Sequence, residues 1–202
     1  MIVAVDVHYG AQVAIAGGVL FNTWSDDTPV REVCVHVSEV EPYKPGSFYK
    51  RELPCLLKLL DKIEESIDIV VIDGYVWLGS DAKPGLGAHL YRALHQKVAV
   101  VGFAKNQFRD SNHAHLVTRG ASIRPLFVTA VGMDPAIAAT NVSQMHGRYR
   151  IPTLLKRVDR ICRMVSQDVQ DQGNSPSKKG KAESPDEMAD DSYRLEDGGV
   201  NT

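Results

Sequence analysis

The chain has 202 residues, 44% of them hydrophobic and 24% charged, with a net charge of −2 at pH 7. This length fits one domain of ordinary size with some excess, and the apolar content is sufficient for a core. The longest apolar runs are far shorter than a membrane span, and no basic segment typical of a secretory signal precedes them. These features argue against a membrane protein and favour a cytoplasmic one, with Cys34, Cys55 and Cys162 as reduced thiols rather than a disulfide framework.

Charge is distributed unevenly along the chain. Residues 1–166 carry 19 Lys+Arg against 16 Asp+Glu, a net +3, whereas residues 167–202 carry 4 against 9, a net −5. The C-terminal segment is almost empty of apolar residues, so it cannot bury enough surface to offset the entropy lost on ordering. We therefore predict a folded domain over 1–166 and an acidic, disordered tail over 167–202.

Hydrophobic spacing divides the folded part into strands and helices. Strands are predicted where short β-branched runs occur, at 1–7, 12–21, 32–37, 69–72, 98–104 and 121–132. Helices are predicted at 48–65, at 88–95, and from Asp134 and Pro152 onward. Three antiparallel strands followed by strands that alternate with helices predict parallel pairing through crossover helices. The resulting expectation is an α/β fold of the ribonuclease H type, a mixed sheet with antiparallel first three strands and flanking helices.

Two acidic residues end buried apolar runs. Asp6 closes IVAVD at the start of the chain, and Asp73 closes IVVID. A carboxylate at the tip of a buried strand is costly unless a cation meets it, and in the ribonuclease H plan the first and fourth strands are neighbours. The pair therefore indicates a divalent metal such as Mg²⁺, which can activate water and stabilise the leaving oxygen of a phosphodiester. An ordinary turn or capping aspartate is the alternative for each.

Longer motifs resemble those of the endonuclease V family, nucleases that cut near deoxyinosine in DNA or inosine in RNA. VAVDV is similar to the first acidic strand of the family, and EPYKPGSFYKRELP is similar to its PYxPGxLxxRExP signature. Further similar segments are IVVIDG, VVGFAKNQF, RPLFVTAVG and GRYRIPTLLKRVDR, so the resemblance covers about residues 2–163. The loop signature is long and order-dependent, which makes it specific.

The resemblance implies a catalytic set of side chains. It assigns binding of Mg²⁺, or Mn²⁺, to Asp6, Glu52 and Asp73, with Asp159 as a further carboxylate nearby. Lys105, which follows a buried strand, would act as a phosphate or oxyanion clamp. The alternatives are a helix N-terminal charge for Glu52, an exposed helical charge for Asp159 and an ordinary solvated lysine for Lys105.

The resemblance also implies a substrate-binding set. A tyrosine in the rigid PYKPG loop would wedge into a duplex where a base has flipped out, the alternative being a ring that packs its loop onto the core. Two glycines and a histidine match the loop that shapes the base pocket in the family. The implied set is Tyr43, Pro45, Gly46, Gly85, Gly87 and His89.

The loop after Asp73 departs from the family pattern. DGYVWLGSDAKPGLGAHL has Val76 in place of a family glycine and Gly79 in place of a family histidine near the metals. Retention of hypoxanthine preference is therefore open, as is DNA against RNA. The main expectation is a monomeric, Mg²⁺-dependent endonuclease acting on inosine-containing nucleic acid and leaving a 5′-phosphate. The alternatives are a nucleic-acid-binding member that has lost catalysis, and a structure-specific nuclease without inosine preference.

Overall fold

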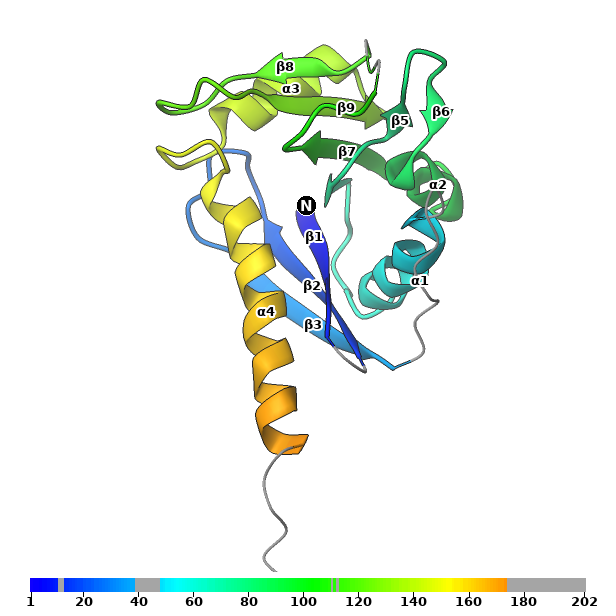
Figure 1. Cartoon of the computed structure of the whole chain (residues 1–202), viewed down its shortest axis with the longest axis vertical. Coiled ribbons are helices and arrows are strands. Elements are labelled where there is room, and N and C mark those ends of the chain that lie inside the picture. Colours follow the sequence, from blue (N-terminus) through cyan, green and yellow to red (C-terminus); the bar gives the residue numbers. More distant parts are fainter. Residues whose placement is uncertain (11–12, 39–47, 110, 112, 174–202) are drawn as a thin grey trace, which may run out of the picture.

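The computed structural model describes residues 1–10, 13–38, 48–109, 111 and 113–173, with side chains as far as Gln167. Tyr43, Pro45 and Gly46 lie outside these residues. The strands are β1 (Ile2–Tyr9), β2 (Ala14–Phe21), β3 (Arg31–Val37), β4 (Ile69–Asp73), β5 (Trp77–Leu78), β6 (Lys83–Pro84), β7 (Ala99–Ala104), β8 (His115–Val117) and β9 (Leu126–Val131). Seven of them form one sheet in the order β3-β2-β1-β4-β7-β9-β8, and β5 pairs with β6 (Figure 1).

The sheet combines antiparallel and parallel pairs. β1, β2 and β3 are antiparallel, as predicted, and β4 and β7 continue from β1 in parallel. The predicted parallel arrangement is wrong for β9, which runs antiparallel to β7. The reason is that the chain enters β9 through an antiparallel pairing with β8 rather than through a crossover helix. The mixed sheet of ribonuclease H type is nevertheless confirmed.

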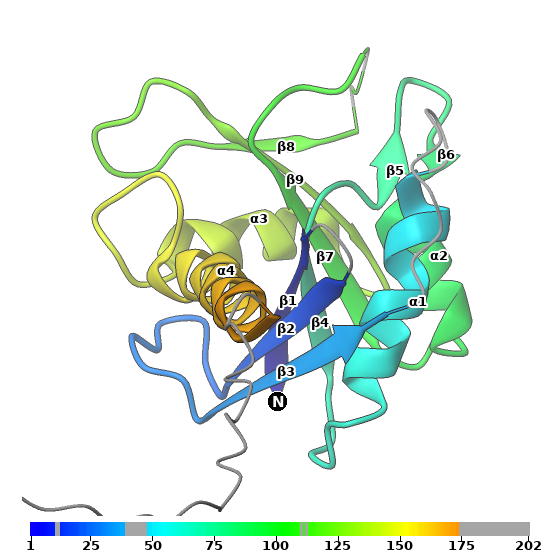
Figure 2. The same cartoon turned by 60° about the horizontal axis from the view of Figure 1, so that its bottom comes forward.

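Two helices cover each face of the sheet (Figure 2). α1 (Phe48–Leu60) and α2 (Leu86–Ala93) pack on one face, where they share a core with Val3, Val70 and Val100. α3 (Pro135–Gln144) and α4 (Thr153–Gly173) pack on the other, over a core that includes Ala4 and Val71. Successive side chains of β1 and β4 point to opposite faces of the sheet, so each strand contributes residues to both cores.

Several element boundaries differ from those predicted. α1 ends at Leu60 instead of residue 65, because Lys62 and Ile63 bond back to Leu59 and Leu60 in tighter turns. α2 begins at Leu86 rather than residue 88, and β5, β6 and β8 were not predicted. α4 continues past residue 166, so the predicted domain boundary falls within a helix.

The three cysteines are free, and Cys55 and Cys162 are buried. In the described part of the chain, no helix combines the length and apolarity needed to span a bilayer.

α4 packs closely against Gly17 of β2. A β-carbon built on Gly17 would overlap Sγ of Cys162 on α4, well inside van der Waals contact. The next residue, Gly18, faces the opposite layer, where its β-carbon would meet Leu59 and Val3 at ordinary contact distances of 3.4 Å. Gly17 is therefore a spacer that sets the distance between α4 and the sheet.

Gly17→Ala should therefore destabilise the protein by about 1–3 kcal/mol, because the added methyl group overpacks the α4 interface. The double variant Gly17→Ala/Cys162→Ala should recover part of this loss, since it removes the sulfur that the methyl group meets. Urea unfolding followed by circular dichroism measures both. Gly18→Ala is the matched control and should change stability by less than about 1 kcal/mol. Equal losses at the two glycines would contradict the spacer role.

Candidate active site

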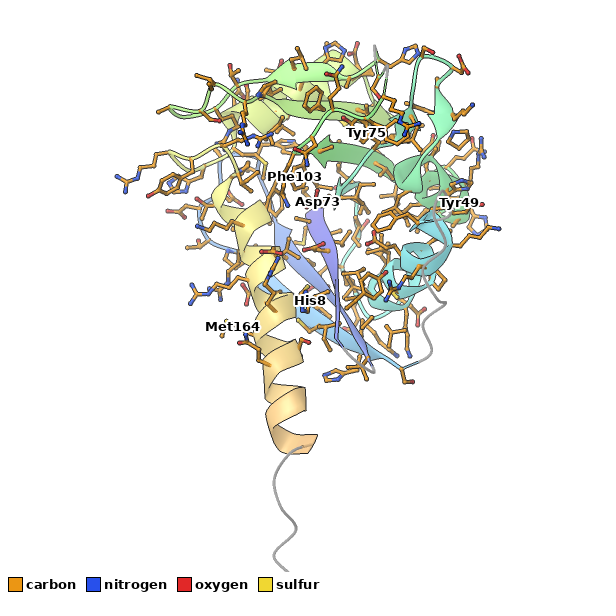
Figure 3. The ribbon with its side chains drawn as sticks, in the orientation of Figure 1. His8, Tyr49, Asp73, Tyr75, Phe103 and Met164 are labelled. Atoms are coloured by element: carbon orange, nitrogen blue, oxygen red, sulfur yellow. The ribbon has the colours of Figure 1, made fainter. Side chains whose placement is uncertain are left out.

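Asp6 and Asp73 lie side by side on neighbouring parallel strands. The β1–β4 pairing ends with Val5 opposite Ile72, so the next residue of each strand is an aspartate. Strand alternation places both carboxylates on the face covered by α4. Asp6 is not at the tip of its strand as predicted, because β1 continues to Tyr9 in its hairpin with β2. The pair instead occupies the point at which the parallel ladder stops, and Figure 3 shows Asp73 there beside Phe103 of β7.

Glu52 approaches the two aspartates from the opposite layer. It lies in the first half of α1 and only 8% of its surface is exposed. Burial, followed by the charges of Asp6 and Asp73, raises the pKa of Glu52 to about 8. Burial and the charge of Asp73 raise the pKa of Asp6 to about 6. The charges of neighbouring carboxylates from other elements therefore disfavour the ionisation of both Glu52 and Asp6.

Lys105 and Asp159 complete this cluster. Lys105 follows β7, and its Nζ donates to Oδ2 of Asp73 at 2.5 Å. Asp159 lies on α4, accepts a hydrogen bond of 3.0 Å from Nε of Arg163, and contributes to the raised pKa of Asp6. The structure thus brings Asp6, Asp73, Lys105 and Asp159 together, and places Glu52 near enough to the two aspartates for their charges to raise its pKa.

The cluster matches a hard divalent cation in donor chemistry. Its ligating atoms are all carboxylate oxygens, which Mg²⁺ and Mn²⁺ prefer, and a cation would relieve the mutual repulsion of the acids. Across the residues described, however, no group of three or more His, Cys, Asp or Glu side chains is close enough together to hold a metal ion. The donor types fit, whereas the side chains do not form a closed ligand shell.

A pocket of about 720 Å³ opens beside the aspartates. Asp6, Asp73, Asp159 and Lys105 form its charged wall, whereas Glu52 lies outside its lining. The opposite wall is the connection between α3 and α4 together with the first turn of α4, which sequence reasoning did not assign to the site. Its polar members are Arg148, Tyr149, Arg150 and Lys156, and its apolar floor includes Phe103, Ile151 and Leu155. The basic and aromatic run GRYR was the available signal.

Arg119 fixes that opposite wall and was also missed. Its buried guanidinium donates to five backbone carbonyls, those of Ser143, Met145, Gly147, Tyr149 and Arg150. The first two lie at the C-terminal end of α3, where carbonyls lack helical partners and carry partial negative charge. A single cation therefore caps α3 and shapes the segment that follows it. A lone arginine in a loop gives no sequence signal for such a role.

The predicted base-pocket residues lie elsewhere. Gly85 caps α2, and a β-carbon on Gly87 would come within 2.6 Å of Cγ2 of Val76, so close packing on the 75–76 segment explains the glycine there. His89 stacks on Tyr49 of α1 with ring centroids 3.7 Å apart. Figure 3 shows Tyr49 on the α1 side of the molecule, away from Asp73. None of the three lines the pocket. Their assignment to substrate binding stays a prediction.

A ribonuclease H-like sheet with clustered acids where its parallel strands end is an architecture of nucleases that cut phosphodiesters. The Endonuclease V family model matches residues 1–133, and the chain belongs to this family. Asp159 and the wall formed by residues 148–156 lie beyond the matched range.

Two curated relatives are named Endonuclease V. Endonuclease V of Streptomyces avermitilis is 28% identical over 187 residues, spanning 80% of this chain and 79% of the relative. Endonuclease V of Nocardia farcinica is 28% identical over 155 residues, spanning 67% of each chain.

Solved structures of the family have the same fold. The catalytic domain of human Endonuclease V superposes with a TM-score of 0.67 at 23% identity, covering 84% of this chain and 83% of that one. Ciona intestinalis Endonuclease V, solved in complex with DNA containing an inosine, gives a TM-score of 0.67 at 18% identity, covering 83% and 86%.

The raised pKa values predict a pH-dependent stability. In the folded protein Glu52 and Asp6 hold their protons up to about pH 8 and about pH 6, above their unfolded values of 4.5 and 3.8. Their stabilising contribution is complete below the unfolded pKa and is lost as pH rises through the folded pKa. In EDTA, the melting temperature should therefore fall between about pH 5 and pH 8.

Glu52→Gln isolates the contribution of Glu52 to this pH dependence of stability. The variant should be more stable than the wild type above pH 8 in EDTA, because it has no charge to bury, and their stability difference should shrink toward pH 5. Glu64→Gln, at an exposed glutamate, is the matched control and should follow the wild type. A wild-type minus Glu52→Gln difference that does not change with pH, measured by thermal melts, would contradict the acidic cluster.

Proposed function

We propose that this protein is a divalent-metal-dependent endonuclease that hydrolyses a phosphodiester bond near inosine or deoxyinosine. The observation that carries the proposal is the meeting of Asp6, Glu52 and Asp73 from three elements, beside a pocket that also contains Asp159 and Lys105. Membership of the Endonuclease V family supports nuclease chemistry. The inosine-containing DNA bound by the Ciona relative supports the substrate class.

Each side chain has a role that follows from its position. Asp6, Glu52 and Asp73 would hold Mg²⁺, or Mn²⁺ in its place, which when bound supplies positive charge at the reacting phosphodiester. Asp159, which lines the same charged wall, adds negative charge that favours cation binding. The ammonium of Lys105 already lies at Asp73, where it can neutralise a phosphate oxygen held beside the carboxylates. The products would be a 3′-hydroxyl and a 5′-phosphate.

The altered loop after Asp73 is compatible with catalysis. The side chain of Val76 is fully buried and packs in the α1–α2 core, so it does not enter the pocket. Gly79 has a φ of +66° and donates its amide to Oγ of Ser111. The titratable groups that the structure places at the pocket include carboxylates and Lys105, which could carry proton transfer there. We therefore place the consequence of the altered loop in rate and base preference rather than in loss of chemistry.

One cleavage assay tests the proposal and its alternatives. Inosine-containing single- and double-stranded DNA and RNA are incubated with the full chain, with Mg²⁺ or with EDTA, and resolved on a denaturing gel beside inosine-free controls. We expect Mg²⁺-dependent cuts near inosine. Binding without any cut would favour the member that has lost catalysis. Equal cutting of inosine-free flaps or mismatches would favour the structure-specific nuclease.

Asp73→Asn should lower the cleavage rate by about a hundredfold or more, because it removes a charge from the centre of the cluster while preserving shape. Its stability should stay within about 1 kcal/mol of the wild type, since relief of repulsion offsets the lost ion pair with Lys105. Single-turnover kinetics and thermal melts measure the two quantities. Asp61→Asn removes the same charge from an exposed turn and should cut at the wild-type rate. Normal cleavage by Asp73→Asn would remove Asp73 from the mechanism.

A further inference from the structure

Tyr149 presents an aromatic ring to solvent at the edge of the active-site pocket. It is 57% exposed and lines the same pocket as Asp6, Asp73 and Asp159, on the opposite wall. A single exposed aromatic residue is unremarkable on a protein surface. Here, however, hydrogen bonds hold the backbone around the ring, and two cations lie close to the ring.

The backbone of Tyr149 is held by its neighbours in space. Arg119 donates to its carbonyl at 3.0 Å and also to the carbonyls of Gly147 and Arg150. Arg150, the next residue, donates from Nη2 to the carbonyl of Pro125 at 2.7 Å and to that of Lys105. The main chain on both sides of Tyr149 is therefore fixed, and only its side chain extends outward. A ring presented in this way loses little conformational freedom when a ligand binds.

Two cations flank the ring. The guanidinium carbon of Arg148 lies 5.0 Å from the ring centroid, with Nη2 donating to the tyrosine hydroxyl at 2.8 Å, and Nζ of Lys156 lies 5.7 Å from the centroid. Two arginines of α4 are neutralised, because Arg157 pairs with Glu32 and Arg163 with Asp159. Among the residues that the structure describes, neither Arg148 nor Lys156 forms a salt bridge.

A solvent-exposed aromatic ring with two unneutralised cations beside it, each within 6 Å of the ring centroid, suits a single-stranded nucleotide. Bases stack on aromatic rings irrespective of their sequence, and lysine or arginine beside the ring neutralises the phosphates. The pocket, at about 720 Å³, is within the size range of ligand sites and joins this wall directly to the carboxylates. A strand whose phosphodiester lies at Asp6 and Asp73 would therefore extend past Tyr149.

We propose that Tyr149 is a stacking platform for an unpaired nucleobase of the cleaved strand, with Arg148 and Lys156 neutralising the adjacent phosphates. This inference rests on the proposed nuclease function and adds a second contact region to it. The stacked base is a neighbour of the cleaved bond, so the platform holds the strand in register with the carboxylates. It also makes single-stranded nucleic acid, or a locally opened duplex, the form bound at this wall.

The test is a binding titration of the full chain with a fluorescent, inosine-containing single-stranded oligodeoxynucleotide in Ca²⁺. Tyr149→Ala should weaken binding by about tenfold to a hundredfold, the range for loss of one stacked base. Tyr149→Phe should stay within about twofold of the wild type, because the ring face is retained. Leu116→Ala, at an exposed apolar residue of β8, is the control and should bind as the wild type does.

A scan of abasic positions shows whether the ring contacts a base. One abasic site near inosine should weaken wild-type binding as much as Tyr149→Ala does, and the same abasic site should cost the variant nothing further. If every abasic site weakens the wild type and Tyr149→Ala equally, the ring does not stack on a base and the proposal fails.

Salt dependence separates the cations from the ring. A plot of log affinity against log salt concentration has a negative slope. Arg148→Met and Lys156→Met should each make this slope less steep by about 0.7, the value for one phosphate of a single strand. Tyr149→Ala should leave that slope unchanged. Unaltered slopes in both cation variants would overturn their assignment.

Cleavage of the same oligonucleotide by the wild type in Mg²⁺ distinguishes failure of the Tyr149 platform from failure of the proposed nuclease function. Normal cleavage with equal binding by Tyr149→Ala refutes the platform and leaves the nuclease function standing. A wild type that neither binds nor cuts any of the oligonucleotides refutes both.

Discussion

The repulsion among like-charged carboxyl groups is the constraint around which this structure is organised. Asp6 and Asp73 adjoin because two parallel strands stop pairing at the same level, and Glu52 meets them from the opposite layer. Burial raises the cost of ionising Asp6 and Glu52, and the charges of the neighbouring carboxylates add to that cost. The fold offsets part of it locally, through the ammonium of Lys105 on Asp73. Retaining such a cluster is costly for stability, and this cost supports the cation-dependent role that we propose for it.

The strands of the sheet centre could be predicted because burial on both faces leaves a continuous β-branched run, as in β4 and β7. The direction of β9 could not, since an apolar strand reads the same in either orientation and only its connection through β8 decides. β8 itself could not be predicted, because His115 and Leu116 are both exposed and the strand has no alternation of buried and exposed residues. The helical spacing that extended α1 to residue 65 was also misleading, because Ile63 packs on the sheet from a turn as well as it would from a helix.

The site was predictable to the extent that its residues interrupt an apolar pattern or belong to a long motif. Asp6 and Asp73 interrupt apolar runs, whereas Glu52 was found only because it belongs to a long motif. The opposite wall escaped because Arg148 and Lys156 read as ordinary surface charges, and nothing along the chain connects Arg119 with a loop some thirty positions later. Spatial proximity created by α3 and α4 folding back over the sheet is the missing information, and no local spacing contains it.

The anchoring of residues 143–150 by Arg119 has a consequence for how this protein can diverge. All five bonds go to main-chain carbonyls, so this anchoring does not depend on the side chains that Arg148 and Tyr149 display. Substitutions at Arg148 or Tyr149 can therefore alter what the wall contacts without disturbing its backbone. Evolvability at this edge of the pocket is thus separated from the acidic cluster, where every change of charge is felt by its neighbours.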